Sequence, residues 1–308
     1  MSQDILVIGG TRYFGIKLVE ALLAAGERVT IATRGRAADP FFDRVRRIVV
    51  DRCDATAMTA AFGGSNAPRY EVVYDQMCYG PAEAALAAQL FGGRVGRYLM
   101  TSTIEVYDAL HGGVERPYRE TDIDIDVAAP VARPPSSYGG GKRRAEATLL
   151  AARDLPVATL RLAHVLGGPE DFTGRLRGYV ERALAGAPLE HAATPGATSF
   201  IDVAGAAAFL VWAGRQDFRG PVNVASDDTL TAPQLHARVA SRLGRRAALR
   251  PIEGQVLPGA LSPFDYAAPH AMDTARAAAL GWRFGSIDAW IDRTIDAQVA
   301  ALRVGLAA

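Results

Sequence analysis

Short apolar runs recur along the first half of the chain, and each is followed by a segment with helical spacing. The runs are rich in β-branched residues, are bounded by turn residues and lie at residues 4–9, 28–33, 46–51, 70–75 and 96–102. They are too apolar for strands with one face in water, which predicts strands buried on both faces. Strands that alternate with helices form a parallel sheet covered on both sides. We therefore expect an α/β fold with a doubly wound parallel sheet.

A glycine-rich turn follows the first run immediately. It reads GGTRYFG, and apolar residues with helical spacing follow it over residues 14–25. In such a turn, backbone N–H groups and the positive end of the helix face a pyrophosphate, and the last glycine lets the helix approach the strand closely. The turn therefore predicts a dinucleotide site formed by Gly9, Gly10, Thr11, Arg12, Tyr13, Phe14 and Gly15.

The end of the second strand decides which dinucleotide fits. An Asp or Glu there would accept hydrogen bonds from the adenosine ribose, but this chain has Thr33, followed by Arg34. A guanidinium pairs with a 2′-phosphate through a planar set of donors, so we expect NADP(H), with NAD as the alternative. Arg34, together with Arg12, would make this contact, although solvated loop arginines would give the same sequence. Asp51, after the third strand, is expected either to contact the adenine or to cap the strand end.

The second half of the chain is less regular than the first. Its strands and helices are separated by longer loops, and long ordered loops are more often functional than decorative. We expect residues 1–162 to form the dinucleotide-binding domain and residues 163–308 to form mainly a smaller, substrate-binding lobe. Segments near residues 198–226 are expected to return to the nucleotide domain.

Lysine is rare in this chain, which has 34 Lys and Arg residues but lysine only at positions 17 and 142. Lys142 stands four residues after Tyr138, so on a helix the two side chains share one face, at about 5–6 Å between their β-carbons. An ammonium group favours the phenolate over the phenol, whose pKa is ordinarily about 10, and brings tyrosine within range of proton transfer at neutral pH. We therefore predict Tyr138 as an acid/base and Lys142 as the group that tunes it.

Three glycines, Gly139 to Gly141, separate this tyrosine from the lysine. Each disfavours a helix by about 1 kcal/mol relative to alanine. Either the helix begins later, which would spoil the geometry of the pair, or the missing side chains leave space for a ligand.

Four motifs occur in order along the chain: GGTRYFG after the first strand, TSTIEVY at the fifth, then YGGGK and FIDV. Together they resemble the extended short-chain dehydrogenase/reductase superfamily, in its NAD(P)-dependent epimerase/dehydratase branch. The first turn is similar to a GGTR subset that includes chloroplast stem-loop-binding proteins. The resemblance implies a Rossmann-like fold and three roles: Tyr138 as proton donor or acceptor, Lys142 as the group that tunes it and holds the nicotinamide ribose, and Thr103 as the hydroxyl that orients the substrate oxygen.

The segment STIEVYD at residues 102–108 resembles the STDEVYG of nucleotide-sugar 4,6-dehydratases. In those enzymes the aspartate is the acid that expels a hydroxyl group, and the glutamate removes a carbon-bound proton. The resemblance implies that Glu105 keeps the second role, whereas Ile104 cannot perform the first. It favours epimerisation or reduction over dehydration. A solvated carboxylate at the sheet edge is the alternative for Glu105.

Four further residues are candidate substrate contacts. Cys78 and Tyr79 follow the fourth strand, His164 follows the sixth, and Arg175 stands near the start of a later helix. Sugar-nucleotide enzymes commonly have asparagine at the position of His164. The histidine therefore weakens the assignment of a sugar nucleotide as the substrate. A histidine beside a cleft can act as a second acid/base, and a satisfied structural histidine is the alternative. Arg175 is expected to hold a phosphate or carboxylate, or to be a solvated helix charge.

These features predict an NAD(P)-dependent enzyme that transfers a hydride at a secondary alcohol or ketone carbon, as a reductase or an epimerase. The substrate is expected to be a small molecule, either sugar-nucleotide-like or another polyhydroxylated or natural-product compound. Two alternatives use the same scaffold. One is a nucleic-acid-binding protein of the stem-loop-binding type that uses the basic segments KRRAE (142–146) and RLGRRAALR (242–250). The other is a nucleotide sensor without turnover.

Charge and cysteine content limit the partners and the location. The formal charge of +1 gives no global attraction to nucleic acid or anionic lipid, so we expect neither as a partner and leave a homodimer open. Only Cys53 and Cys78 are present and no export signal is visible, which favours the cytoplasm. The most apolar helical segment, 203–214, is about half a membrane span in length. The DIDID run at 122–126 lacks the glycine and distal glutamate of a calcium loop, so we expect no metal site.

Overall fold

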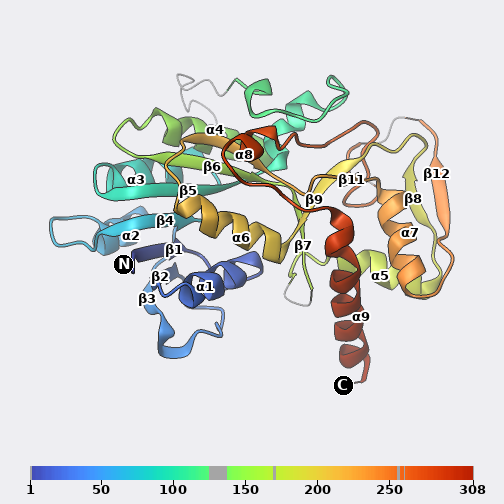
Figure 1. The fold of residues 1–308 in the computed structure, drawn as a ribbon, viewed down its shortest axis with the longest axis horizontal. Coiled ribbons are helices and arrows are strands. Elements are labelled where there is room, and N and C mark those ends of the chain that lie inside the picture. Colours follow the sequence, from blue (N-terminus) through green and yellow to red (C-terminus); the bar gives the residue numbers. More distant parts are fainter. Residues whose placement is uncertain (1, 125–136, 169–170, 255–256, 260, 308) are drawn as a thin grey trace. The chain divides into compact units, whose positions relative to one another are not determined.

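The computed structural model describes residues 2–124, 137–168, 171–254, 257–259 and 261–307 (Figure 1). The last two residues of the DIDID run lie outside this part. The chain divides into two compact units. The first comprises residues 1–108, 120–162 and 204–223, and the second comprises residues 109–119, 163–203 and 224–308.

A seven-stranded sheet forms the centre of the first unit, in the strand order β10-β6-β5-β4-β1-β2-β3. Neighbouring strands from β3 to β6 are parallel, and the chain reverses its direction of progress across the sheet between β1 and β4. The predicted doubly wound parallel sheet is therefore confirmed. The strands are β1 (Asp4–Ile8), β2 (Arg28–Thr33), β3 (Arg46–Val49), β4 (Tyr70–Asp75), β5 (Val95–Thr103), β6 (Val157–Leu162) and β10 (Gly220–Val224).

Helices cover both faces of this sheet (Figure 1). On one face, α2 (Ala55–Phe62), α3 (Pro81–Phe91) and α4 (Tyr138–Ala151) share a core with the strands, in which Met58, Leu90 and Leu149 pack with Val73 of β4. The next residue of β4, Tyr74, points to the other face, because successive strand residues alternate. There its hydroxyl comes so close to Gly214 of α6 (Val203–Gly214) that a β-carbon would collide with it. The helix α1 (Phe14–Ala24) covers the same face.

The second unit contains two small sheets and four helices in its described part. The strands β7 (His164–Leu166), β9 (Thr198–Asp202) and β11 (Thr229–Leu230) form one sheet, and β8 (Leu189–Ala192) pairs in parallel with β12 (Leu249–Ile252). The helices are α5 (Arg175–Ala185), α7 (Ala232–Arg242), α8 (Ala275–Ala279) and α9 (Ile291–Ala307). Val180, Leu235 and Ile295, from three of these helices, lie together in its apolar core.

The predicted strands agree closely with the observed ones in the first unit. Near the C-terminus, a short 3₁₀ turn at Ile287–Ala289 precedes the final helix, which begins at Ile291. The apolar segment 203–214 forms the helix α6, whose buried residues include Phe209 and Leu210. Among the residues that the structure describes, none of the helices combines the length and the hydropathy that crossing a membrane requires.

Candidate active site

The glycine turn leads from β1 into α1 and has the backbone geometry that only glycine adopts easily. Gly9 and Gly10 have φ angles of 102° and 89°. A β-carbon on Gly15 would lie 2.9 Å from the Cα atom of Gly10, so a side chain there would open the turn. Tyr13, at the start of α1, has φ of 55°, a strained value for a non-glycine residue, and its side chain does not cap the helix. The Gly15 and Ile16 N–H groups donate to the carbonyl oxygens of Arg12 and Tyr13 at 3.0 and 3.1 Å, so this turn offers a phosphate mainly the positive end of the α1 dipole.

Residues at the ends of β2 and β3 frame the other end of the expected dinucleotide site. The Thr33 hydroxyl accepts a hydrogen bond from the Gly35 N–H at 3.2 Å, whereas Arg34 is exposed and makes no ion pair within the described residues. Asp51 accepts from the Cys53 N–H at 3.0 Å, so its carboxylate stabilises the turn after β3. Among the residues that the structure describes, the Arg34 guanidinium therefore has no ionic partner at the end of β2.

Tyr138 and Lys142 lie one turn apart on α4, which begins at Tyr138. The hydroxyl of Ser137 caps the helix by accepting from the Gly140 N–H at 3.0 Å. The ammonium of Lys142 lies 5.8 Å from the centroid of the Tyr138 ring. Tyr138 is 53% exposed and Lys142 only 1%. The expectation that a late helix start could separate the pair is wrong, because Ser137 caps the helix before the glycines.

The glycine run has a packing reason. A β-carbon on Gly139 would collide with the carbonyl oxygen of Glu105 and lie 2.6 Å from a carboxylate oxygen of Asp108. Asp108 also accepts hydrogen bonds from Ser137, at 3.2 Å, and from Arg143. Glycine therefore lets the start of α4 pack directly against the main chain of the segment that follows β5.

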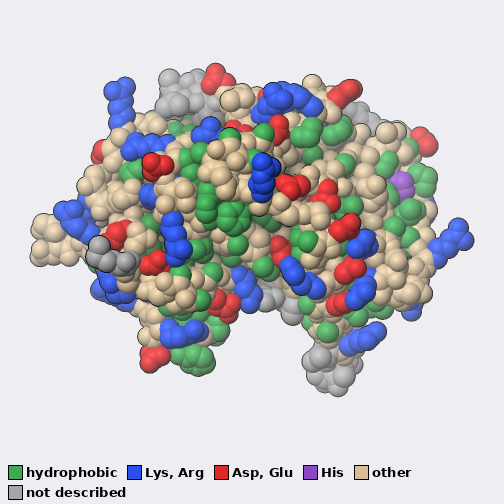
Figure 2. Space-filling view, viewed as in Figure 1, with side chains coloured by type: hydrophobic (Ala, Val, Ile, Leu, Met, Phe, Trp, Pro, Cys, Tyr) green, Lys and Arg blue, Asp and Glu red, His purple; other side chains and the backbone are tan. Residues whose placement is uncertain are grey.

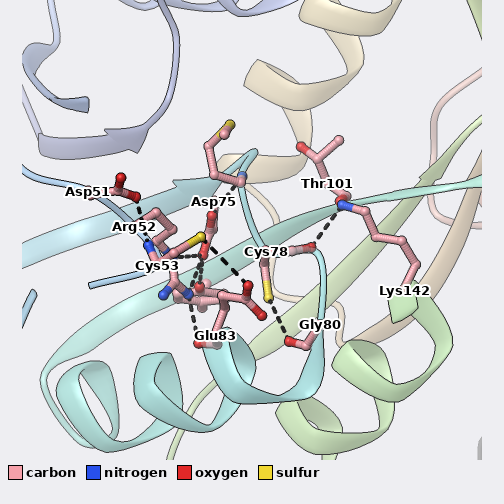
Figure 3. Close-up of polar contacts among 11 residues, drawn as sticks. Asp51, Arg52, Cys53, Asp75, Cys78, Gly80, Glu83, Thr101 and Lys142 are labelled. Carbon is pink, nitrogen blue, oxygen red and sulfur yellow. Dashed lines mark hydrogen bonds and ion pairs between the residues drawn. The ribbon is translucent and has the colours of Figure 1, made fainter. Parts of the chain in front are cut away.

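Main-chain oxygens hold the ammonium of Lys142 in place (Figure 3). It donates to the carbonyl oxygens of Cys78 and Thr101, each at 2.8 Å, and lies 4.5 Å from the centroid of the Tyr79 ring. Burial lowers the pKa of this ammonium, and the negative charges of Asp75 and Glu146 oppose that change. Lys142 is therefore a positive charge held in a fixed position near the rings of Tyr79 and Tyr138.

The turn that carries the Cys78 carbonyl is anchored by a buried carboxylate. Asp75, which has no exposed surface, accepts from Arg52 at 2.8 and 3.0 Å (Figure 3). It also accepts from the Tyr98 hydroxyl at 2.5 Å and from the Met77 N–H at 2.9 Å. Sequence reasoning missed this cluster. Its local signal was an aspartate that ends a strand in which Val72, Val73 and Tyr74 are buried.

A second buried ion pair lies one turn further along α4. Glu146 and Arg161 of β6 approach to 2.7 Å, and neither side chain has any exposed surface. Ser102 of β5 donates a hydrogen bond to the same carboxylate. This pair therefore joins α4, β5 and β6 next to the carbonyl that holds Lys142. Its sequence signal was an arginine inside an apolar strand.

The remaining candidates of the first unit have different environments. The Thr103 hydroxyl is largely buried and accepts from the Glu105 N–H at 3.3 Å. The Cys78 side chain is buried, and burial raises the pKa of its thiol. Its carbonyl oxygen accepts the hydrogen bond from Lys142. Tyr79 is 43% exposed, and its ring centroid lies 6.3 Å from that of Tyr138.

His164 and Arg175 belong to the second unit. The His164 Nε2 atom lies 3.0 Å from the Tyr266 hydroxyl, and its ring packs on Phe264 with centroids 5.1 Å apart. Burial, together with the positive charge of Arg175, holds the pKa of this histidine well below its usual value. The Arg175 guanidinium lies over the Phe264 ring at 5.4 Å. Both residues thus belong to an aromatic cluster within that unit, which fits a structural role.

The basic segments do not form a row of free positive charges. In KRRAE, Lys142 is buried and Arg143 pairs with Asp108, and in the second segment Arg242 pairs with Asp296 at 2.5 Å. On the face drawn in Figure 2, side chains of both charges are interspersed. This arrangement gives little support to the nucleic-acid-binding alternative.

The sheet order, the glycine turn and the Tyr/Lys pair together define an α/β enzyme that binds a nicotinamide dinucleotide. The chain belongs to the NAD dependent epimerase/dehydratase family, whose model matches residues 5–225. The predicted family and the predicted class, a nicotinamide-dependent oxidoreductase or epimerase, are therefore confirmed.

Two curated relatives are reductases. The 2′-dehydrokanamycin reductase of Streptomyces kanamyceticus is 30% identical over 251 residues, which are 78% of this chain and 67% of the relative. The 3-diazoavenalumate denitrifying reductase of a Streptomyces species is 30% identical over 311 residues, 91% of this chain and 95% of the relative. The dTDP-glucose 4,6-dehydratase of Bacillus anthracis, solved in complex with NAD, has a TM-score of 0.76 at 14% identity, with 97% of each chain covered, and so shares the fold.

Proposed function

We propose that this enzyme is an NADP(H)-dependent reductase that delivers a hydride to a ketone carbon of a polyhydroxylated or natural-product small molecule. The observation that carries the proposal is the pair on α4: an exposed Tyr138 and, one turn later, a buried Lys142 held by two carbonyl oxygens. The two curated relatives named as reductases support the same reaction class.

Side chains of this enzyme donate the proton and orient the substrate, while the bound cofactor supplies the hydride. The Tyr138 hydroxyl gives its proton to the substrate oxygen as negative charge develops there. The Lys142 charge stabilises the resulting phenolate. Two of its three N–H donors are used by carbonyl oxygens, which leaves one for a ribose hydroxyl. Because the Thr103 oxygen accepts from the Glu105 N–H, its own hydroxyl hydrogen is available to orient the substrate oxygen.

The environment of Ile104 argues against dehydration. Its side chain is 1% exposed and carries no acid, so it offers no proton for the expulsion of a hydroxyl group. Epimerisation is the second candidate, because Glu105, two residues after the end of β5, supplies a carboxylate that can remove a carbon-bound proton.

NADP(H) is proposed over NAD(H) because Arg34 is exposed and unpaired within the described residues, at the end of β2 where NAD-binding sites place a carboxylate. Gly9, Gly10 and the positive end of α1, which no side chain caps, would hold the pyrophosphate.

The test is a turnover assay of the purified enzyme with NADPH, followed by absorbance of the reduced nicotinamide, against natural-product ketones, dehydro-aminoglycosides and nucleotide sugars. A reductase consumes one NADPH per alcohol formed. Conversion of a sugar to its epimer without net NADPH consumption would replace the reductase by the second candidate. Binding of the cofactor without conversion of any substrate class would favour a nucleotide sensor and contradict the proposal.

A further inference from the structure

Gln76, the first residue after β4, places its side-chain amide among the three glycines of the first turn. Its Oε1 atom accepts a hydrogen bond from the Gly10 N–H at 3.1 Å. A β-carbon on Gly15 would lie 2.5 Å from the same oxygen, and one on Gly9 would lie 3.4 Å from it. The absence of a side chain at Gly15 therefore leaves room for this amide.

The orientation of the amide follows from its partner. The Gly10 N–H can only donate, so the oxygen of the amide must face it and the nitrogen must point elsewhere. That nitrogen, Nε2, is buried and makes no hydrogen bond within the described part of the chain. Buried donors of this kind are rare, because an unsatisfied donor loses its hydrogen bonds to water without replacement. An acceptor from outside the chain is therefore expected.

The main chain that carries Gln76 is held in place. Its backbone N–H donates to the Ile8 carbonyl oxygen at 3.1 Å, and the next N–H, of Met77, donates to Asp75 at 2.9 Å. The bond from the Gly10 N–H then fixes the amide at the other end of the side chain. Asp75 is in turn held by Arg52 (Figure 3). The donor is thus fixed beside a turn whose backbone and helix end favour an anion.

We propose that the Gln76 side-chain nitrogen donates a hydrogen bond to a phosphate oxygen of the dinucleotide. Phosphate oxygens only accept, so they suit an N–H that lacks a protein acceptor, and a hydrogen bond to a charged oxygen is stronger than one to a neutral group. Gln76 lies outside the glycine motif and becomes a further cofactor-binding residue. The inference rests on the dinucleotide site of the proposed function and is independent of the substrate.

The test is a calorimetric titration of the full chain with ADP, adenosine and NADPH, comparing wild type with Gln76→Glu. The variant keeps the size of the side chain and an acceptor for the Gly10 N–H, but it replaces the donor by a negative charge. We expect the dissociation constants of ADP and NADPH to rise at least about tenfold, with adenosine binding unchanged. Gln216→Glu is the matched control, because Gln216 is a half-buried glutamine of the same unit whose Nε2 atom donates to the Trp212 carbonyl at 3.3 Å.

Gln76→Met removes the donor without adding charge. This variant takes the place of Gln76→Glu in the titration if Gln76→Glu does not fold. We expect this variant to weaken ADP binding severalfold and to leave adenosine binding unchanged. Unchanged ADP binding in a folded variant, or equal losses for ADP and adenosine, would overturn the inference. ADP binding requires no hydride transfer, so a failure of the proposed reductase activity would leave this result standing.

Discussion

Gly139 lies so close to the carbonyl oxygen of Glu105 that a β-carbon on this glycine would collide with it. The first turn of α4, which carries Tyr138, is thereby packed against the segment that carries Glu105. A residue that is poor for a helix is required here by a contact distant in sequence.

We predict that Gly139→Ala destabilises the protein by about 1–3 kcal/mol through overpacking, although alanine favours a helix by about 1 kcal/mol over glycine. The measurement is the free energy of unfolding in urea. Gly178→Ala is the matched control, because Gly178 lies in the helix α5 and a β-carbon there meets no atom within 4 Å. This control should be stabilised by about 1 kcal/mol. Equal effects of the two substitutions would contradict the packing account.

The buried pair of Arg161 and Glu146 gives a second prediction. Arg161→Met leaves a carboxylate buried without its partner, so we expect a loss of about 3–5 kcal/mol in the free energy of unfolding. The double variant Arg161→Met/Glu146→Leu should recover much of this loss, because neither charge then remains. Arg177→Met is the control. It breaks the exposed pair with Glu181, and the loss should be below about 1 kcal/mol. A loss this small for Arg161→Met would refute the prediction.

The low pKa of His164 predicts a pH-dependent stability. Because burial, with Arg175 next in importance, disfavours the protonated form, the folded chain stays neutral at this residue while the unfolded chain takes up a proton below a pH of about 6.5. The contribution of His164 to the free energy of unfolding is therefore fully present above this pH. It decreases as the pH falls, by at most about 1.4 kcal/mol per pH unit for one group.

The check is the thermal midpoint between pH 5 and 8 for wild type, His164→Gln and the control His191→Gln, a buried histidine outside the aromatic cluster. We expect a shallower dependence on pH for His164→Gln and the wild-type slope for the control. Identical slopes in all three proteins would exclude His164 as the source.

Part of this structure follows from local sequence, and part does not. The β1 run and the glycine turn predicted the sheet and the dinucleotide site, because strand periodicity and turn chemistry are local. The spacing of Tyr138 and Lys142 predicted their common helix face. The links from Arg52 to Asp75 and from Glu146 to Arg161 join residues that only the fold brings together, and no local pattern identifies such partners. For the same reason Gln76 was missed: nothing in its neighbours indicates that its amide reaches the glycines.

Arg34 decides the expected cofactor preference. We predict that Arg34→Ala raises the dissociation constant of NADPH at least about tenfold, because a charge-assisted pair with the 2′-phosphate is lost, and leaves that of NADH nearly unchanged. Fluorescence titration of the cofactor-free protein measures both values. Arg36→Ala, which removes another exposed arginine of the same loop, is the control. Equal losses for NADPH and NADH would refute a phosphate-specific role.

The most direct test of the central claim is single-turnover oxidation of NADPH by a ketone substrate, measured for wild type and Tyr138→Phe alongside a titration of each with NADPH. The account predicts that Tyr138→Phe lowers the rate by at least about 100-fold, because the proton donor is lost, and leaves NADPH affinity within about twofold of wild type. Lys142→Met should lower both the rate and the NADPH affinity, because Lys142 is proposed to contact the cofactor ribose. A Tyr138→Phe enzyme that keeps the wild-type rate would contradict the assignment of Tyr138 as the proton donor.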